Sequence, residues 1–178
     1  MNEEQQWIDQ ARQGDADAFE RLVRLYEKRV YALTSRMCRN PTDAEEAAQE
    51  AFLSAWQGLR FFRQESEFST WLYRIAYNVF YDYIRSRKET TELDSREVDA
   101  ANSVEQDNIG QRMDIYQSLK KLKEVERTCI TLFYMEDVSI DKIAGIVGIP
   151  AGTVKSHLSR GKEKLAMYLK QNGYDGNR

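Results

Sequence analysis

The chain is poor in the residues that build metal sites and nucleophilic active sites. It contains one histidine, His157, and two cysteines, Cys38 and Cys129, which lie far apart and outside any CxxC pair. These are too few for a zinc site, and their positions do not indicate a Cys-His or Ser-His-Asp catalytic arrangement. The sequence also lacks a glycine-rich phosphate-binding loop. We therefore expect a protein that is not an enzyme, binds no metal or cofactor, and keeps both thiols reduced.

Proline, glycine and long apolar runs are also scarce. The 178 residues include only 2 prolines and 9 glycines, which favours helices over a turn-rich β fold. No apolar run is long enough to cross a bilayer, and the first ten residues, MNEEQQWIDQ, are polar and acidic rather than a signal peptide. We therefore expect an all-α protein that stays in the cytoplasm and does not insert into a membrane.

The net charge of −3 is unevenly distributed along the chain. Two mildly basic blocks, residues 60–88 and 113–170, lie on either side of a strongly acidic stretch at 89–109. That stretch has few apolar residues and cannot bury enough surface to fold alone, so it predicts a flexible acidic linker between two small helical domains. The predicted parts are a helical domain at 1–88, the linker at 89–112, a second helical domain at 113–170 and a tail at 171–178.

Helical periodicity continues through much of the first domain. Asp15 or Asp17 can cap a long helix that ends near Asn40. Thr42 and Glu45 then have the spacing of a capping box for the next helix. The outer face of that helix is acidic, which alone suggests a solvated surface. This face carries Asp43, Glu46, Gln49 and Glu50.

The stretch 61–88 combines aromatic and arginine side chains. At helical spacing it has one apolar stripe and one face of rings, arginines and polar groups. Exposed rings are unusual on a solvated helix, whereas unstacked nucleic-acid bases bind to rings and arginines. The pattern fits either a face for single-stranded nucleic acid or a tyrosine-rich helix packed on a neighbour. The predicted stripe is Phe68, Trp71, Leu72, Ile75, Ala76, Val79 and Tyr83. The predicted outer face is Tyr73, Arg74, Tyr77, Asn78, Tyr81, Asp82 and Arg85.

Residues 139–165 predict a helix-turn-helix whose second helix would lie in the major groove of DNA. Ser139 can cap the first helix, and Gly148 can end it. The second helix starts near Thr153, and Gly161 on its buried side predicts close approach of a neighbouring helix. The alternative is a basic amphipathic helix that closes a small bundle. The predicted exposed face is Thr153, Lys155, Ser156, His157, Ser159, Arg160, Lys162 and Lys164.

Both halves of the chain resemble extracytoplasmic-function (ECF) sigma factors, a group of alternative subunits of bacterial RNA polymerase. In the first half the resemblance rests on DAEEAAQEAFLSAW (43–56) and FRQESEFSTWLYRIAYNVFYDYIRSRK (62–88). In the second half it rests on LKEVERTCITLFYMEDVSIDKIAGIVGIPAGTVKSHLSRGKEKL (122–165). The resemblance implies a subunit that directs core RNA polymerase to promoter DNA and starts melting, and that an anti-sigma factor holds in check. The competing hypothesis is a free-standing helix-turn-helix transcriptional regulator whose N-terminal helices sense a ligand or dimerise.

The resemblance also implies a role for each face. The acidic helix would dock on core polymerase through Asp43, Glu46, Gln49 and Glu50. The −10 element would be read by Phe62, Gln64, Ser66, Phe68, Thr70, Trp71, Arg74, Tyr77 and Asn78. The −35 element would be read by Thr153, Lys155, Ser156, His157, Ser159 and Arg160. The chain departs from the family pattern at Gln64, where glycine is common, at His157, where arginine is usual, and at Gly161, where alanine is frequent.

Overall fold

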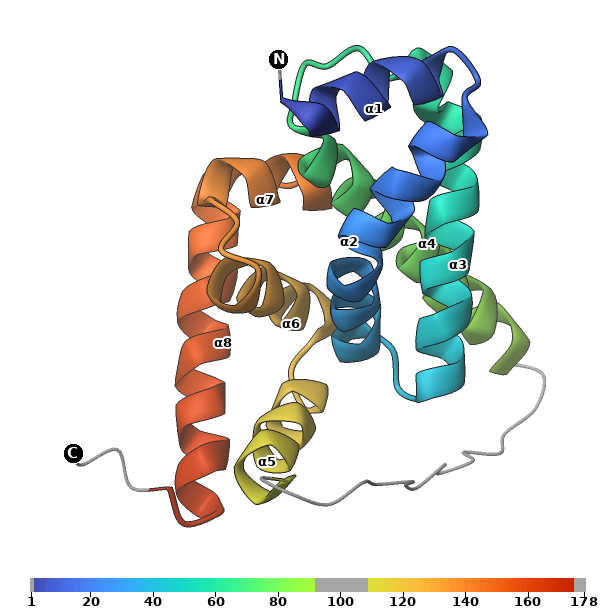
Figure 1. Ribbon diagram of the computed structural model, residues 1–178. Coiled ribbons are helices and arrows are strands. Elements are labelled where there is room, and N and C mark those ends of the chain that lie inside the picture. The colour runs from blue at the N-terminus through green and yellow to red at the C-terminus, as the bar shows by residue number, and fades with distance from the viewer. Residues whose placement is uncertain (1, 92–108, 175–178) are drawn as a thin grey trace. The chain divides into compact units, whose positions relative to one another are not determined.

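The described residues of the computed structural model, 2–91 and 109–174, are helical or lie in the connections between helices (Figure 1). No strand occurs in these ranges, so the prediction of an all-α chain is confirmed. The chain divides into two compact units, Met1–Thr90 and Thr91–Arg178. Most of the predicted linker, residues 92–108, lies outside the described residues. None of the described helices combines the length and the apolar character that a membrane span requires.

Unit 1 contains helices α1 (Glu3–Arg12), α2 (Ala16–Met37), α3 (Pro41–Gly58) and α4 (Phe68–Thr91), with a short 3-10 helix, η1 (Leu59–Phe61), after α3. The cap of α2 is Asp15, as predicted, and its side chain accepts hydrogen bonds from the backbone N–H groups of Asp17 and Ala18. The predicted cap of α3 is wrong. Asn40 caps this helix in place of Thr42, because Pro41 occupies the first helical position, where a missing N–H costs nothing.

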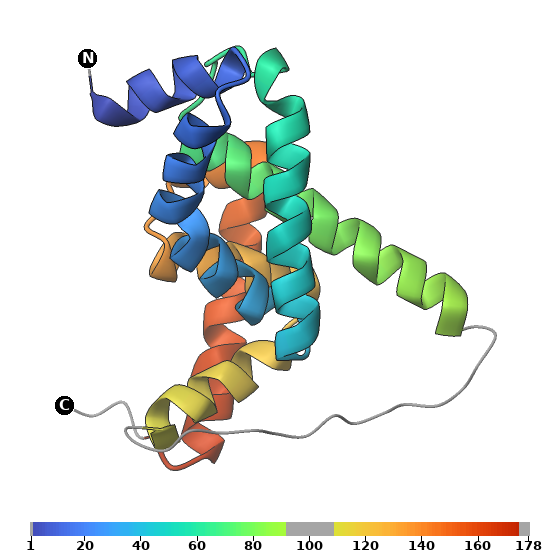
Figure 2. The ribbon, with the colours of Figure 1, turned by 45° about the vertical axis from the view of Figure 1, so that its right-hand side comes forward.

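The core of unit 1 lies between α2 and α3, which run antiparallel and side by side, with α4 crossing them obliquely (Figure 2). From α2, Leu22, Val30 and Leu33 are almost fully buried. They face a helix whose inner side is alanine, and small side chains let two helix backbones approach closely. The buried alanines of α3 are Ala44, Ala47, Ala48, Ala51 and Ala55.

Unit 2 contains α5 (Ile109–Lys120), α6 (Glu124–Ile130), a π-helical turn η2 (Thr131–Met135), α7 (Ile140–Val147) and α8 (Ala151–Gln171). The helical segment breaks at Lys123, which is the N-cap of α6. Ser139 caps α7, and Gly148 ends it with a left-handed backbone at φ 76°, which confirms both predictions. The second helix of the motif begins at Ala151, two residues before the predicted start, because Pro150 already stands at its N-cap.

Gly161 lies where α8 meets α6. A Cβ atom at this position would come within 2.9 Å of Ile130 Cγ1, closer than side-chain carbons pack. The predicted close approach of a neighbouring helix is therefore confirmed. The helix α8 packs against α6 and α7 through Val154, Leu158 and Gly161 and also contacts α5, whereas Lys155, Ser156, Ser159 and Arg160 are exposed.

Candidate nucleic-acid and protein interfaces

The acidic face of α3 presents three of its four predicted residues to solvent. Glu46, Gln49 and Glu50 are exposed, whereas Asp43 is only 9% exposed. The Asp43 carboxylate accepts hydrogen bonds from Asn40 Nδ2 at 2.7 Å and from Arg87 Nη1 at 3.0 Å. The prediction that Asp43 lies on the outer face is therefore wrong, because the cap of α3 turns this carboxylate toward the end of α4.

An apolar groove of about 500 Å³ adjoins the acidic face, between α2 and α3. Its walls include Phe19 of α2 and Trp56 of α3, whose ring centroids lie 5.0 Å apart. Leu53, also in the wall, is 57% exposed. Gln49 belongs both to the groove and to the acidic face. An open apolar surface next to an acidic helix face is typical of a protein-binding site rather than of a nucleic-acid-binding site.

The residues predicted to read the −10 element fall into two groups. The first is a cluster of rings that closes the loop between η1 and α4. The Phe62 and Phe68 rings are 4% exposed, and their centroids lie 5.9 Å apart. The Phe62 ring lies 4.9 Å from Trp71, and the Phe68 ring lies 5.4 Å from Tyr26 of α2. Because Phe62 and Phe68 are buried, they hold the two ends of the loop together.

Gln64, in the middle of this loop, is tied to α1. Its backbone is left-handed, with φ 58°, a conformation that glycine adopts most easily. Its side-chain amide donates to Asp9 Oδ1 at 2.8 Å and accepts from Gln5 Nε2 at 3.1 Å. A glycine would adopt this backbone more easily, whereas glutamine adds two hydrogen bonds to α1. Sequence reasoning missed Gln5 and Asp9, because nothing in the pattern of a polar helix reveals a partner 55 residues away.

The second group is exposed on α4 and the loop. Ser66, Arg74 and Asn78 are exposed, and Thr70 is half-buried. The predicted outer face is wrong at Tyr73 and Tyr77, which are 3% and 8% exposed. Phe80, absent from the predicted stripe, is 2% exposed.

The predicted outer face of α4 is wrong at Tyr73 and Tyr77 because the buried side chains of this helix are spaced four residues apart. Steps of four from Phe68 through Leu72, Ala76 and Phe80 turn gradually around a helix of 3.6 residues per turn, which brings Tyr73 and Tyr77 to the buried side.

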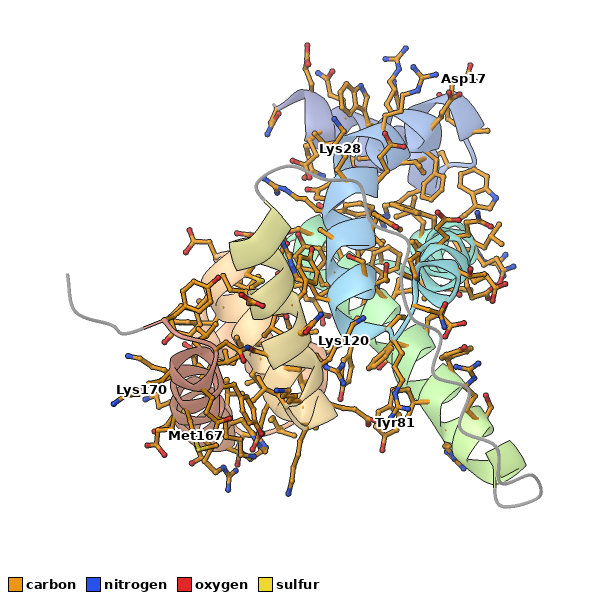
Figure 3. The ribbon with its side chains drawn as sticks, turned by 90° about the horizontal axis from the view of Figure 1, so that it is seen from below. Asp17, Lys28, Tyr81, Lys120, Met167 and Lys170 are labelled. Carbon is orange, nitrogen blue, oxygen red and sulfur yellow. The ribbon has the colours of Figure 1, made fainter. Side chains whose placement is uncertain are left out.

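Two exposed rings remain beside the loop and on α4. Phe61, at the end of η1, is 68% exposed, and the Arg60 guanidinium carbon lies 4.5 Å from the centre of its ring. Tyr81 is 50% exposed and projects from α4 (Figure 3). Phe61 is not among the predicted site residues, although it stands directly before the loop in the sequence.

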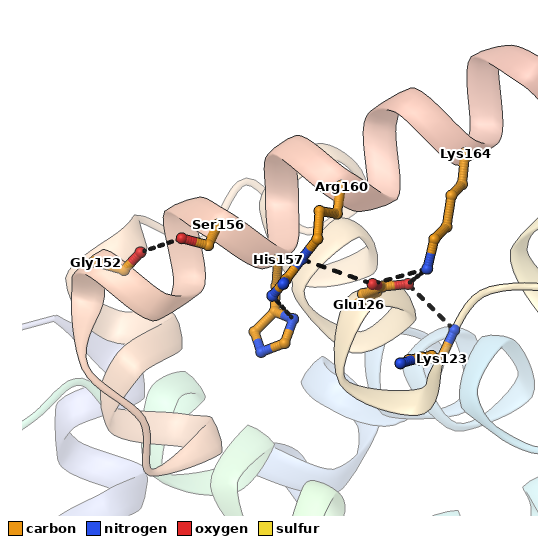
Figure 4. Close-up of polar contacts among 7 residues, drawn as sticks. All are labelled: Lys123, Glu126, Gly152, Ser156, His157, Arg160 and Lys164. Carbon is orange, nitrogen blue, oxygen red and sulfur yellow. Dashed lines mark hydrogen bonds and ion pairs between the residues drawn. The ribbon is translucent and has the colours of Figure 1, made fainter.

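On α8, four of the six residues predicted to read the −35 element are exposed: Lys155, Ser156, Ser159 and Arg160. Thr153 and His157 are half-buried. The hydroxyl of Ser156 donates to the Gly152 carbonyl at 3.1 Å. Arg160 Nη2 lies 3.3 Å from His157 Nδ1 (Figure 4).

A buried carboxylate lies beneath this face. Glu126 of α6 is 2% exposed, and its two oxygens accept hydrogen bonds from Lys164 Nζ at 3.0 and 2.8 Å (Figure 4). Arg160 Nε lies 4.0 Å from the same carboxylate. Burial raises the pKa of Glu126, but the hydrogen bond and positive charge of Lys164 outweigh burial and hold this pKa below its ordinary value. Sequence reasoning missed Glu126, because it stands among the charged residues Lys123, Glu124 and Arg127 and nothing in the pattern marks it as buried.

Cys38 and Cys129 are free thiols and both are buried, as the sequence predicts. Among residues 2–91 and 109–174, no His, Cys, Asp and Glu side chains are grouped so that they could hold a metal ion.

Comparison with known proteins matches both units to one family. Sigma-70 region 2 matches residues 22–90, and sigma-70 region 4 matches residues 112–165. The chain is 37% identical to the ECF RNA polymerase sigma factor SigW of Bacillus subtilis, with 92% of this chain and 95% of that protein covered. It is 33% identical to the ECF RNA polymerase sigma-E factor of Haemophilus influenzae, with 91% and 93% covered.

A similar fold occurs in the solved structure of the sigma factor RpoE from Bartonella quintana in complex with the anti-sigma factor NepR. The TM-score is 0.78 and the sequence identity 25%, with 85% of this chain and 96% of that chain covered.

Proposed function

Because the chain belongs to the ECF group of RNA polymerase sigma factors, which direct the polymerase to promoters, we propose which of its surfaces performs each step. Family membership removes the competing hypothesis of a free-standing regulator. It also implies a protein that acts in the cytoplasm, where bacterial transcription takes place. We keep the predicted division into a polymerase-docking and −10-reading domain at 1–88 and a −35-reading domain at 113–170.

Core polymerase docks on the acidic face of α3 together with the adjoining groove. The supporting observation is that Glu46, Gln49 and Glu50 are exposed on α3, and that Gln49 also lines an open apolar groove that includes Leu53. Burial of apolar groove walls supplies affinity, and rim charges select and orient the partner. Asp43 is not part of this surface, because its carboxylate is already engaged by Asn40 and Arg87.

The −10 element is captured as a single strand by the loop and by the exposed side of α4. Melting DNA requires about 1.4 kcal/mol per base-pair step. A protein without ATP supplies this only by binding the separated strand better than the duplex. Ser66, Arg74 and Asn78 are exposed for such contacts. Arg60 and Phe61 add a ring and a guanidinium beside the loop, and a stacked base is worth about 1–3 kcal/mol.

The remaining members of the predicted −10 set have a structural role. Phe62, Phe68 and Trp71 hold the loop closed, and Gln64 ties it to α1. A loop that is already ordered does not spend binding energy on becoming ordered when DNA arrives. Tyr77, at 8% exposed, contributes to packing.

The −35 element is read in the duplex by α8. Its exposed face carries Lys155, Ser156, Ser159 and Arg160, which combine phosphate-binding charges with groups that can reach base edges. We also infer that an anti-sigma protein covers one or more of these surfaces, on the model of the RpoE–NepR complex.

Run-off transcription with core polymerase on a promoter library tests the whole proposal, with permanganate reactivity of thymines as the measure of melting. Asn78→Ala should reduce melting more than it reduces binding to the closed duplex. Equal loss of both, or no loss, would remove Asn78 from the −10 surface.

Docking is tested separately, by co-purification with core polymerase. Glu50→Lys should lower the recovered complex. The matched control is Glu27→Lys, a charge reversal at an exposed residue of α2 that does not line the groove. Equal recovery of the two variants would contradict the assignment of the docking face.

A further inference from the structure

The contact between His157 and Arg160 restricts the protonation of the histidine ring. Arg160 Nη2 lies 3.3 Å from His157 Nδ1 (Figure 4). A guanidinium group has only donors and no acceptor. The contact is therefore a hydrogen bond only if Nδ1 carries no proton and accepts. A neutral imidazole that accepts at Nδ1 carries its proton on Nε2, so this ring has one N–H donor left for another partner.

Arg160 is itself held in place by the buried carboxylate of Glu126. Its Nε lies 4.0 Å from Glu126 Oε1, and its Nη2 faces His157. Glu126 is fixed in turn by Lys164 Nζ, at 2.8 and 3.0 Å, and by the Lys123 backbone N–H at 3.4 Å. The chain of contacts thus runs from a buried anchor on α6 to the ring on α8.

The charged groups around His157 favour its neutral form. Arg160 and Lys164 face it from α8, and Lys123 and Glu126 face it from α6. Burial lowers the pKa of His157, and the positive charges of Arg160, Lys123 and Lys164 lower it further against the opposing effect of Glu126. Burial and the nearby positive charges therefore both favour the neutral ring.

We propose that His157 is a specificity-determining residue for the −35 element, which donates a single hydrogen bond from Nε2 to a base acceptor while Arg160 supplies the positive charge. The inference rests on the proposed role of α8 and deepens it. Guanine offers acceptors at N7 and O6, adenine at N7 and thymine at O4. An arginine at this position could donate two hydrogen bonds to guanine, whereas a single N–H group can donate to an acceptor on guanine, adenine or thymine.

The tautomer can be measured directly, because the chain contains only one histidine. In the full-length protein labelled with ¹⁵N-histidine, the ring nitrogens should show a protonated Nε2 and an unprotonated Nδ1 at pH 7.5. Arg160→Met removes the donor and should return the ring to a mixture of tautomers. A proton on Nδ1, or an imidazolium ring, in the unmodified protein would overturn the proposal. An unchanged spectrum in Arg160→Met would also overturn it.

Promoter binding by the reconstituted holoenzyme tests the role of the neutral ring. His157→Gln should leave the slope of log K against log salt unchanged, whereas Arg160→Gln should make it shallower by about 0.9, the value for one phosphate contact. His157→Gln should also reduce discrimination at one −35 position, roughly five- to tenfold for one hydrogen bond. A shallower slope in His157→Gln, or unchanged discrimination at every position, would overturn the proposal.

The proposed function can fail independently of this inference. If the unmodified holoenzyme started no transcript at any promoter, the function assigned to the surfaces would be wrong, whereas the NMR spectrum of the protein alone would still decide the tautomer.

Discussion

Removing the cation that pairs with Glu126 should destabilise unit 2 alone. Lys164→Met keeps most of the apolar stem and deletes the ammonium group that hydrogen-bonds both carboxylate oxygens. Loss of one partner of a fully buried pair costs about 3–5 kcal/mol. Lys164 is 34% exposed, and Glu126 keeps the Lys123 N–H and the edge of Arg160. Screening by solvent therefore reduces the expected cost to about 1–2 kcal/mol.

The positions of the tryptophans make this cost easy to assign to one unit. Trp7, Trp56 and Trp71 all belong to unit 1, so tryptophan fluorescence follows the unfolding of that unit only. Far-UV circular dichroism follows the helices of both units. Since about 1 kcal/mol shifts the Tm of a domain this small by about 4–8 °C, Lys164→Met should lower the dichroism transition of unit 2 by roughly 4–16 °C. The fluorescence transition should not move.

Two further variants decide the cause of the effect. Lys162→Met makes the same change at an exposed residue of the same helix and should stay within about 0.5 kcal/mol of the unmodified protein. The double variant Glu126→Gln with Lys164→Met also removes the buried negative charge that Lys164→Met leaves without its lysine partner. It should recover part of the lost stability of unit 2. If Lys164→Met behaved like Lys162→Met, or if the fluorescence transition moved, the buried ion pair would not be the support that we describe.

Three other predictions use the same measurements or a simple labelling assay. Gly148→Ala should cost unit 2 about 1–2 kcal/mol through the left-handed backbone at φ 76° alone, because no atom lies within 4 Å of the added Cβ; an unchanged Tm would contradict this. Unit 2 should lose stability as the pH falls below about 5, because the pKa of Glu126 is held below its unfolded value and the unfolded chain then binds the extra proton; the loss should be smaller in Glu126→Gln. Ellman's reagent should react with Cys38 and Cys129 only as fast as the protein unfolds, since they are 3% and 0% exposed and burial raises the pKa of Cys129 to about 11; rapid labelling of either native thiol would refute this.

The helix-turn-helix was the part of the fold most accessible to prediction, since its signals are local. Ser139 and Gly148 are recognised from their positions at the ends of an apolar periodic segment, and both have the predicted roles. Gly161 was also interpretable, because a helix-interior glycine is costly unless a neighbour needs the space.

The errors have a common physical origin. Asp43, Tyr73 and Tyr77 were placed outside because a helical projection of one segment does not show how far a neighbouring helix reaches around it. The Asp43 carboxylate accepts a hydrogen bond from Arg87, which lies 44 residues away in sequence. Tyr73 and Tyr77 are covered because the buried stripe of α4 drifts with four-residue steps. Contacts between distant segments decide such residues, and periodicity carries no information about them.

The two units use different forces to hold in position the groups that we propose to face DNA. In unit 1, packed rings fix the loop: Phe62 and Phe68 are buried, and hydrophobic contacts of this kind respond little to salt or pH. In unit 2, the carboxylate of Glu126 fixes the cations of α8, so the arrangement depends on one proton. The difference suits the two forms of DNA that we propose for them, a separated strand for unit 1 and an intact duplex for unit 2. Capture of a separated strand must offset the energy of melting, so its loop has to be ordered in advance. Reading an intact duplex requires only that charged and donor groups face the groove at the correct spacing, which an ion pair beneath the helix can ensure.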